Sequence, residues 1–225
     1  MNNHKVDWVR VELHLHSVAS PDSLIQPQKL IDYCARIGID RFAITDHNSI
    51  EGALAAKALV PDRVIVGEEI ETTQGELLGY FMSECVPAGL EPMAAIERLR
   101  AQGAVISVSH PFDTTRSCHW SEAQLSAIAP YVDAIEVFNA RCPTNVPNLK
   151  AAAFADQHGL LETVGSDAHS LIELGRATLT MPGFLYAEGF KNALKVADSD
   201  ARLSSVFVHL LSRIAVIRKR LFIKS

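Results

Sequence analysis

The chain has 225 residues, of which 48% are hydrophobic and 21% are charged, and its formal net charge is −5. This length suits one α/β domain with one sizeable core, and no apolar run approaches the ~18 residues that a membrane span needs. Residues 1–200 carry 15 Lys/Arg against 26 Asp/Glu, so the main body is acidic. This part of the chain therefore lacks the broad basic face that long nucleic acids require, and its negative charge attracts divalent cations.

Short β-like runs alternate with helix-like segments along the chain. The run RVELHLH alternates aliphatic and polar residues, which is typical of a strand. PQKLIDYCARIG follows, with Pro27 near its start and Gly38 at its end, as helices prefer. The later runs are RFAIT, IEGALAAKAL, RVIVGEEIE, GELLGYFM, EPMAAIERLRAQG, AVISVSH, SEAQLSAIA, DAIEVFN, NLKAAAFADQHG, LLETVGSD and ATLTM. About seven β/α units fit this order, so we expect an α/β fold with a mostly parallel sheet, closed as a barrel or left open.

The four cysteines stand at positions 34, 85, 118 and 142 and form no CxxC pair. They suggest no disulfide framework and fit a reduced compartment. The stretch MNNHKVDWVR has no apolar core of a signal peptide, so we expect a cytoplasmic protein.

Polar residues that can bind metals stand where the predicted strands end. His14 and His16 are two positions apart on the first strand, so their side chains point the same way, ~6–7 Å apart. Taken singly, each motif is explained by a chance pair, a turn or a solvated strand end. In parallel β/α folds, however, the carboxyl ends of the strands meet at one place, where active sites form. The strand-end residues are His14, His16, Asp46, His47, Glu69, His110, Asn139, Asp167 and His169.

Imidazole nitrogens and carboxylate oxygens are ligands for zinc, manganese and iron, and no cysteine joins this set. The number of ligands indicates two or three divalent ions, with magnesium also possible. A bridging carboxylate, best assigned to Glu69, could hold two ions ~3.5–4 Å apart.

The motifs ELHLHS, AITDHNS, GEEIET, SHPF and GSDAH resemble, in this order, successive motifs of the PHP family, the polymerase and histidinol phosphatase domain. The resemblance covers roughly residues 9 to 182. It implies a distorted (β/α)7 barrel, similar to a TIM barrel, with a metal cluster at its carboxyl-terminal face. It also implies hydrolysis of phosphoesters.

The resemblance further implies which residues hold each ion. The family motif Gly-x-Glu selects Glu69 over Glu68 as the bridging ligand, and SPDS replaces the more common Ser-Asp-Gly, which makes Asp22 the matching acidic residue. Asp46 would orient a ligand, and Glu12 would either do the same or form a salt bridge at the strand end. The implied sets are His14, His16, Glu69 and Asp167 for one ion, Glu69 and His110 for a second, and His47, His169 and Asp22 for a third.

Glu76 stands where many PHP relatives have a histidine that binds the second ion. A carboxylate in its place is a harder ligand and favours Mn²⁺, Fe²⁺ or Mg²⁺ over Zn²⁺. The alternatives are an exposed charge after Gly75, or a side chain that points away and leaves the second site weak.

A metal-activated hydroxide would attack the phosphorus atom, because bound metal lowers the pKa of water toward ~7. Arginines in loops beyond the strand ends would bind the phosphate, or they are ordinary surface residues. A Cys118 nucleophile beside His119 is disfavoured, since no third partner is evident. We expect Asp46, His169 and Arg176 to act in catalysis, and Arg116, Asn139, Arg141 and Arg176 to bind the substrate.

The expected substrate is a small phosphorylated metabolite or a nucleotide, and long nucleic acid is disfavoured. Specificity would come from the loops at 112–121 and 140–147. The alternative is a metal-binding PHP module with a structural or regulatory role and no turnover.

Residues 1–200 form the expected PHP domain, and residues 201–225 form an expected basic amphipathic helix. Its apolar residues follow the spacing of a heptad seam over about two and a half heptads, fewer than the ~3–4 that indicate a coiled coil. The helix would dock on its own barrel, form a homodimer, or contact an anionic surface, so a monomer or a homodimer is expected. The seam residues are Leu203, Phe207, Leu210, Ile214, Ile217 and Leu221.

Overall fold

The computed structural model describes residues 7–222, so the ends of the expected domain and tail, at 1–6 and 223–225, lie outside the described residues. The strands are β1 (Trp8–Glu12), β2 (Arg41–Ile44), β3 (Val64–Glu71), β4 (Glu76–Tyr80), β5 (Val105–Val108), β6 (Ala134–Asn139), β7 (Leu161–Gly165), β8 (Ala177–Pro182) and β9 (Asp198–Ala201). The helices are α1 (Pro27–Arg36), α2 (Glu51–Leu59), α3 (Pro92–Ala101), α4 (Glu122–Ile128), α5 (Val146–His158), α6 (Ala187–Leu194) and α7 (Val208–Phe222), with short 3-10 helices η1 (Ala129–Tyr131) and η2 (Leu171–Glu173).

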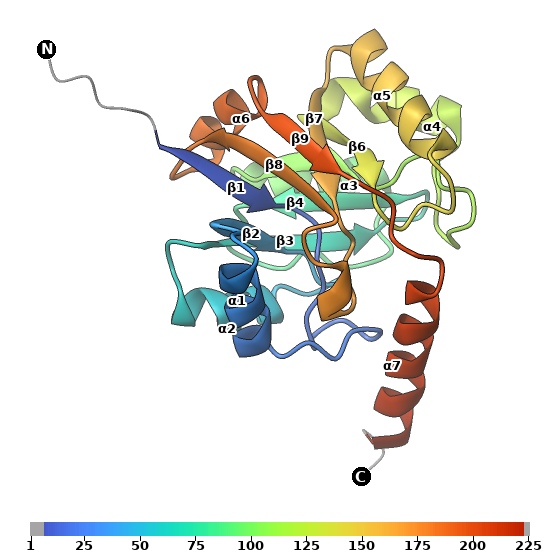
Figure 1. Cartoon of the computed structure of the whole chain (residues 1–225). Helices are drawn as coiled ribbons and strands as arrows, with labels where there is room; N and C mark the ends of the chain where they lie inside the picture. The colour runs from blue at the N-terminus through green and yellow to red at the C-terminus, as the bar shows by residue number, and fades with distance from the viewer. Residues whose placement is uncertain (1–6, 223–225) are drawn as a thin grey trace, which may run out of the picture.

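The strands form one mixed sheet in the order β7-β6-β5-β4-β3-β2-β1-β8-β9 (Figure 1). β1, β2 and β3 are parallel, as are β5, β6 and β7. β4 pairs antiparallel with both β3 and β5, so the two parallel groups run in the same direction. β8 is antiparallel to β1 and to β9.

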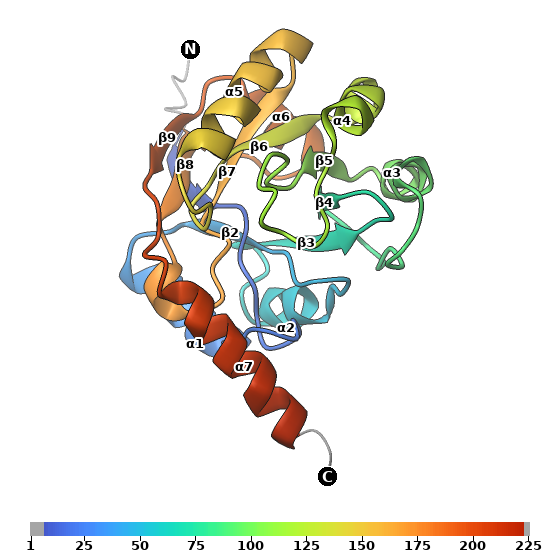
Figure 2. The same ribbon diagram turned by 90° about the vertical axis from the view of Figure 1, so that its right-hand side faces the viewer.

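The sheet curls until β7 and β8 lie against each other, which makes a nearly closed barrel. Figure 2 looks toward the carboxyl-terminal ends of the parallel strands, with α3, α4 and α5 outside the barrel wall. The expected distorted TIM-like α/β barrel is therefore confirmed, although β4, β8 and β9 add antiparallel strands to the simple β/α alternation.

Two apolar clusters form the core, because successive side chains on a strand point to opposite faces. On β2, Phe42 and Ile44 belong to the larger cluster beneath the helices, whereas Ala43 faces the barrel interior. The same alternation on β3 places Ile65 in the interior cluster, between two residues of the outer one. Glu69 lies on the same face of β3 as Ile65, so the strand aims this carboxylate into the barrel.

The local sequence explains several helix ends, and the two signals predicted for the first helix, Pro27 and Gly38, are confirmed. Pro27 occupies the first turn of α1, and Gly38 beyond its end has φ of 71°. Gly159 ends α5 in the left-handed conformation, with φ of 65°, which a glycine adopts without a Cβ clash. Ser121 and Gln124 form a reciprocal capping box at the start of α4.

Two strand ends differ from the sequence expectation. The ladder of β1 stops at Glu12, and the chain continues through the two histidines with only Leu15 bridged, to Ala168. Glu69 lies within β3 instead of at its end, because the strand continues to Glu71, the end of the predicted run, and forms a hairpin with β4. Both differences arise because neighbouring strands, and not the local pattern, decide where pairing ends.

The tail also differs from the expected continuous helix over 201–225. Ala201 completes β9, and α7 begins only at Val208. Leu203 and Phe207 therefore lie before the helix, and the seam on α7 is shorter than the sequence suggests.

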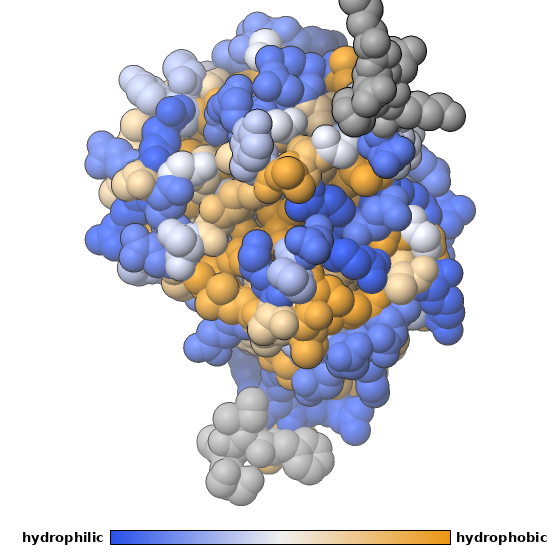
Figure 3. Space-filling view, turned by 90° about the vertical axis from the view of Figure 1, so that its left-hand side faces the viewer, coloured by the Kyte–Doolittle hydropathy of each residue, from blue (hydrophilic) through white to orange (hydrophobic). Residues whose placement is uncertain are grey.

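The opposite end of the barrel, where the parallel strands begin, has an apolar patch surrounded by polar side chains (Figure 3). Every cluster of potential metal ligands found among residues 7–222 lies at the other end. No helix in this described part is both long and apolar enough to cross a membrane.

Candidate metal centre

The expected metal ligands lie together at the carboxyl-terminal ends of the strands. They come from several strand ends and the loops beside them, so the barrel topology brings distant parts of the chain into contact. His14 and His16 follow β1, Asp22 lies in the next loop, and His47 follows β2. The remaining ligands are Glu69 within β3, Glu76 at the start of β4, His110 after β5, and Asp167 and His169 after β7.

Glu69 is the centre of the cluster. Its Oε2 atom lies 3.3 Å from His14 Nε2, 3.4 Å from His16 Nε2 and 3.1 Å from His47 Nδ1. Its Oε1 atom lies 3.0 Å from His110 Nε2. One buried carboxylate thus contacts four imidazoles, as a carboxylate that bridges metal sites would.

Asp167 approaches the same two histidines from the other side. Its Oδ1 atom lies 3.2 Å from His16 Nε2 and 3.7 Å from His14 Nε2. Asp167 has φ of 51° and His110 has φ of 24°, values that are unusual for residues other than glycine. Such strain persists where the surrounding contacts hold the residue in place, and it is commonly found at functional sites.

Three groups of side chains converge closely enough to hold an ion, with ligand atoms within 4.8 Å of one another. Asp22 joins the group of His16, His47 and His169, because its Oδ2 atom lies 2.9 Å from His169 Nε2 and 3.7 Å from His47 Nε2. The groups are His14, His16 and Glu69; His47, Glu69 and Glu76; and His16, His47 and His169.

The hydrogen bonds of two rings show which atoms face the centre. His14 Nδ1 lies 2.9 Å from Glu136 Oε1, so Nδ1 carries a proton and Nε2 faces the centre. Burial lowers the pKa of His14, but Glu69, Glu136 and Asp167 raise it well above its ordinary value, so a metal ion would take the place of the proton on Nε2. His16 Nδ1 lies 3.0 Å from Ser20 Oγ, and this hydroxyl donates to Asp46, so Nδ1 of His16 also carries a proton. The two Nε2 atoms face Glu69 Oε2 and Asp167 Oδ1. None of these four buried atoms has a hydrogen-bond partner among the described residues.

Buried lone pairs that face each other repel unless a cation lies between them. Burial and the neighbouring His169 and His47 hold the pKa of His16 well below its ordinary value, so this ring is neutral. Burial opposes ionisation of Glu69, but His14 and His47 hold its pKa well below the usual range. A neutral imidazole beside an ionised carboxylate is the state in which both bind a metal ion. The donor set therefore fits divalent cations.

Comparison with known proteins agrees with this geometry. The model of the PHP domain matches residues 12–125, about half of the chain, and the model of the PHP-associated region matches residues 145–199. The chain belongs to the PHP family. An uncharacterized protein of Methanocaldococcus jannaschii is 36% identical to it over 202 residues, which cover 85% of this chain and 81% of that protein.

Two solved structures share the PHP fold. A two-domain protein from Bacteroides vulgatus, which contains a predicted PHP-like metal-dependent phosphoesterase, has a TM-score of 0.72 and 19% identity over 87% of this chain. The chain spans 65% of that protein's length. PsfC from Pseudomonas syringae has a TM-score of 0.67 and 19% identity, covering 96% of this chain and all of PsfC. At these identities the likeness concerns the fold alone.

Glu76 points into the PHP centre, the cluster of proposed metal ligands around Glu69. Its Oε2 atom lies 3.3 Å from His110 Nε2, and its side chain is 12% exposed. Burial raises the pKa of Glu76 to about 7, and the nearby Glu69 adds to this shift because two neighbouring carboxylates repel each other. A cation between them would remove that repulsion, so the geometry suits a ligand better than a surface charge.

Glu136 on β6 is a buried part of the PHP centre that the sequence analysis missed. It accepts hydrogen bonds from the His14 ring and, at 2.9 Å, from the backbone N–H of His110. Asn139 also donates to Glu136, at 3.0 Å, and to Asp167 Oδ2, at 3.3 Å. Asn139 thus orients carboxylates in this structure. An acidic residue inside the apolar run DAIEVFN was the available signal.

Asp46 contacts the His16 ring indirectly, through a serine hydroxyl. Its carboxylate accepts hydrogen bonds from Ser17 and Ser20, and Ser20 in turn contacts the His16 ring. Glu12 accepts hydrogen bonds from Ser166 and Gly175 and so holds the loop of Asp167. Glu68 lies on the opposite face of β3 from Glu69 and accepts from Val86 N at 2.9 Å.

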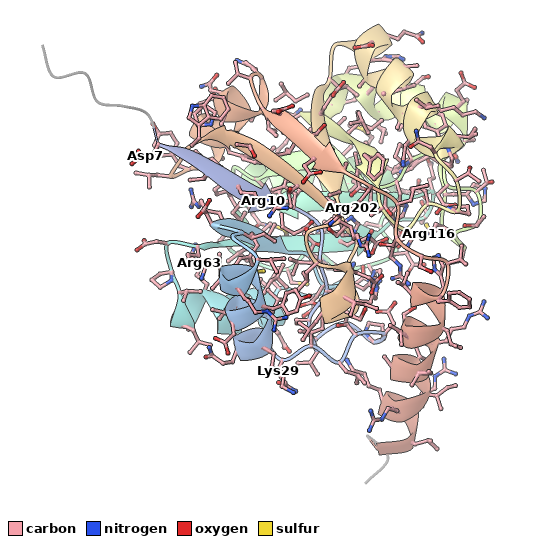
Figure 4. All side chains as sticks on the ribbon, in the orientation of Figure 1. Asp7, Arg10, Lys29, Arg63, Arg116 and Arg202 are labelled. Carbon is pink, nitrogen blue, oxygen red and sulfur yellow. The ribbon has the colours of Figure 1, made fainter. Side chains whose placement is uncertain are left out.

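The three expected phosphate-binding arginines differ in position. Arg116 contacts Asp167 and, at 3.2 Å, Asp113. Figure 4 shows Arg116 on the side of the molecule where the parallel strands end. Arg141 is buried and contacts the His169 ring, while its Nε atom lies 3.4 Å from Glu173. Arg176 lines a separate cavity, beside Arg10 and Arg202, and no contact in the described part joins it to the histidines.

The four cysteines are free. Burial raises the pKa of the Cys118 thiol to about 11, which disfavours a thiolate nucleophile there. His119 contacts the carbonyl of Arg116 and does not contact this thiol.

Proposed function

We propose that this protein hydrolyses a phosphoester in a small phosphorylated metabolite or a nucleotide, with two or three divalent ions as cofactors. One observation carries the proposal: buried imidazole nitrogens and carboxylate oxygens from three strand ends, those of β1, β3 and β7, face one another without hydrogen-bond partners in the described part of the chain. Structural groups of this kind would be paired with donors. Family membership supports the same reaction class.

The proposed ligands divide among three sites. His14, His16, Glu69 and Asp167 would hold one ion. Glu69 would be shared with a second ion that takes His110 and Glu76. His47, His169 and Asp22 would hold a third. Four carboxylates among the ligands favour Mn²⁺ or Fe²⁺, while Zn²⁺ and Mg²⁺ are further candidates.

Bound divalent cations would supply the activated water and neutralise phosphoryl charge. The remaining steps fall to the chain's own residues. Arg116, which contacts the cluster through Asp167, would bind the phosphoryl oxygens through the guanidinium N–H groups that Asp167 and Asp113 leave free. Asp46 and Glu136 would hold the histidine rings in the orientation that exposes Nε2.

Arg141 and Arg176 have weaker support as substrate-binding residues. The guanidinium of Arg141 is occupied by Glu173, Ser212 and the His169 ring. It would therefore position His169 instead of binding phosphate. Arg176 would need a substrate that reaches its separate cavity.

A screen of phosphorylated compounds with the Mn²⁺-loaded protein tests the proposal. We expect turnover of at least one phosphoester, and its loss in Asp167→Asn. The second candidate is a PHP module that binds metal for a structural or regulatory role. Fully metallated protein that hydrolyses no compound in the screen would favour this module and overturn the proposed enzyme.

A further inference from the structure

A cavity of about 320 Å³ lies between α7, the loop after β1 and the loop after β7. This volume is at the small end of the roughly 300–1,000 Å³ typical of ligand pockets. Leu24, Leu211 and Ile214 are partly exposed there, at 39%, 39% and 42%. Its apolar lining residues are Leu24, Ile25, Leu171, Leu211, Ile214 and Ala215.

The α7 wall of this cavity is held in place by polar contacts on both sides. Lys219 Nζ donates to the carbonyls of Val18, at 2.5 Å, and Ser20. Arg141 donates to Ser212 Oγ at 2.9 Å. Ala215 is buried at the contact with the barrel. The wall is therefore a built part of the molecule, and Figure 2 shows α7 crossing in front of α1.

His169 connects the cavity to the metal centre. Its ring lines the cavity, stacks on His16 with centroids 4.1 Å apart, and has Nε2 2.9 Å from Asp22. The cavity and the metal centre thus share His169, so a ligand in the cavity lies beside the centre.

The charges around the cavity are cationic. Its charged lining residues are Lys29 at the start of α1 and Arg218 on α7. Lys29 projects below α1 in Figure 4. No carboxylate belongs to the described lining, so the walls suit an apolar group that ends in a negative charge.

We propose that this cavity binds the alcohol half of the phosphoester, and that this half is one aromatic ring or a short alkyl chain carrying an anionic group. The hydrolysis of this phosphoester rests on the proposed phosphoesterase function, whereas its binding in the cavity does not depend on that function. Because α7 begins beyond residue 199, where the matched PHP regions end, it supplies specificity from outside those regions.

Non-hydrolysable phosphonates test this binding without any turnover. Methylphosphonate, benzylphosphonate and 4-carboxybenzylphosphonate would be titrated calorimetrically into the Mn²⁺-loaded full chain. We expect benzylphosphonate to bind at least ~10-fold tighter than methylphosphonate, because the ring leaves water. The carboxylate should add about threefold, an increment that salt reduces. Equal affinity for the methyl and benzyl compounds would overturn the proposal.

Substitutions on α7 offer matched controls. Ile214→Asp should remove the preference for the benzyl compound, whereas Ile217→Asp, one turn away at a 57% exposed position outside the lining, should retain it. Arg218→Ala should remove the carboxylate increment, and Arg213→Ala, on the outer side of the helix, should not. Equal effects within either pair would contradict the assigned cavity.

The two proposals fail in different ways. A benzyl preference without turnover of any phosphoester would leave the cavity in place and refute the enzyme. Turnover without a benzyl preference would support the enzyme and refute the cavity as the site of the alcohol half.

Discussion

Glu136 holds the His14 ring with its Nε2 atom toward Glu69. The Glu136 Oε1 atom lies 2.9 Å from His14 Nδ1, and both side chains are buried. The other carboxylate oxygen accepts the backbone N–H of His110. One residue of β6 thus orients two proposed ligands from different strands.

Glu136→Gln should reduce metal affinity and activity about 10–100-fold, because an amide cannot accept both hydrogen bonds. Excess Mn²⁺ should partly restore activity, since the direct ligands remain. Activity as a function of metal concentration measures this. Glu162→Gln, on the exposed side of β7, is the control and should behave as wild type. Wild-type metal affinity in Glu136→Gln would refute the orienting role.

Asp167→Asn and His14→Ala should each reduce hydrolysis more than about 100-fold while the fold survives, because direct ligands matter more than their supports. EDTA should inactivate the protein, and Mn²⁺ or Zn²⁺ should restore it. Metal at 100 times its Kd should also stabilise the fold by about 2.7 kcal/mol, which thermal unfolding detects without substrate. Full activity of metal-free protein would contradict the proposed centre.

Glu76→Gln should lose about one bound ion and on the order of 10–100-fold in activity, because a neutral amide binds metal less tightly than a carboxylate. The control is Glu71→Gln, since Glu71 is the exposed partner of Glu76 in the β3–β4 hairpin. Metal content by mass spectrometry and turnover are the measurements. Unchanged metal content and unchanged turnover in both variants would show that Glu76 is not a metal ligand.

Gly165→Ala should destabilise the protein by about 1–3 kcal/mol through overpacking. A Cβ at this position would lie 2.3 Å from His14 Cβ and 2.3 Å from Glu136 Oε1. Gly189→Ala on α6, where the nearest atom is 3.5 Å away, should instead stabilise by about 0.4–1 kcal/mol. Urea unfolding measures both. The same sign for the two variants would show that the close approach at Gly165 is unimportant.

The outer side of α7 carries an exposed apolar row that includes Leu210, Ile217 and Leu221. Arginines at positions 213 and 220 stand beside it, so two copies that paired here would bring like charges together. Salt screens such repulsion. We expect light scattering to show a monomer at low salt and a dimer fraction that grows with salt and disappears in Ile217→Asp. The mass of a single chain at every salt concentration would rule out this pairing.

The residue pattern by itself determined the α/β class and which polar residues stand at the strand ends, whereas the closed barrel was implied by the resemblance to the PHP family. Alternating strands and helices require a parallel arrangement, and this arrangement brings the carboxyl ends of the strands together. Residues such as His14, His47 and His110, each after its own strand, are therefore neighbours by topology alone. Local spacing was also enough to place Pro27 and Gly38 at the ends of α1.

Only the tertiary structure decided which polar residues support the ligands and what α7 contacts. Glu136 lies 122 residues from His14 in the chain, and no local pattern records their hydrogen bond. Arg141 and Arg176 looked alike in sequence, yet one is buried against α7 and the other lines a separate cavity. The start of α7 at Val208 likewise depends on β9 pairing with β8. Such contacts depend on the packing of distant segments, which residue periodicity does not encode.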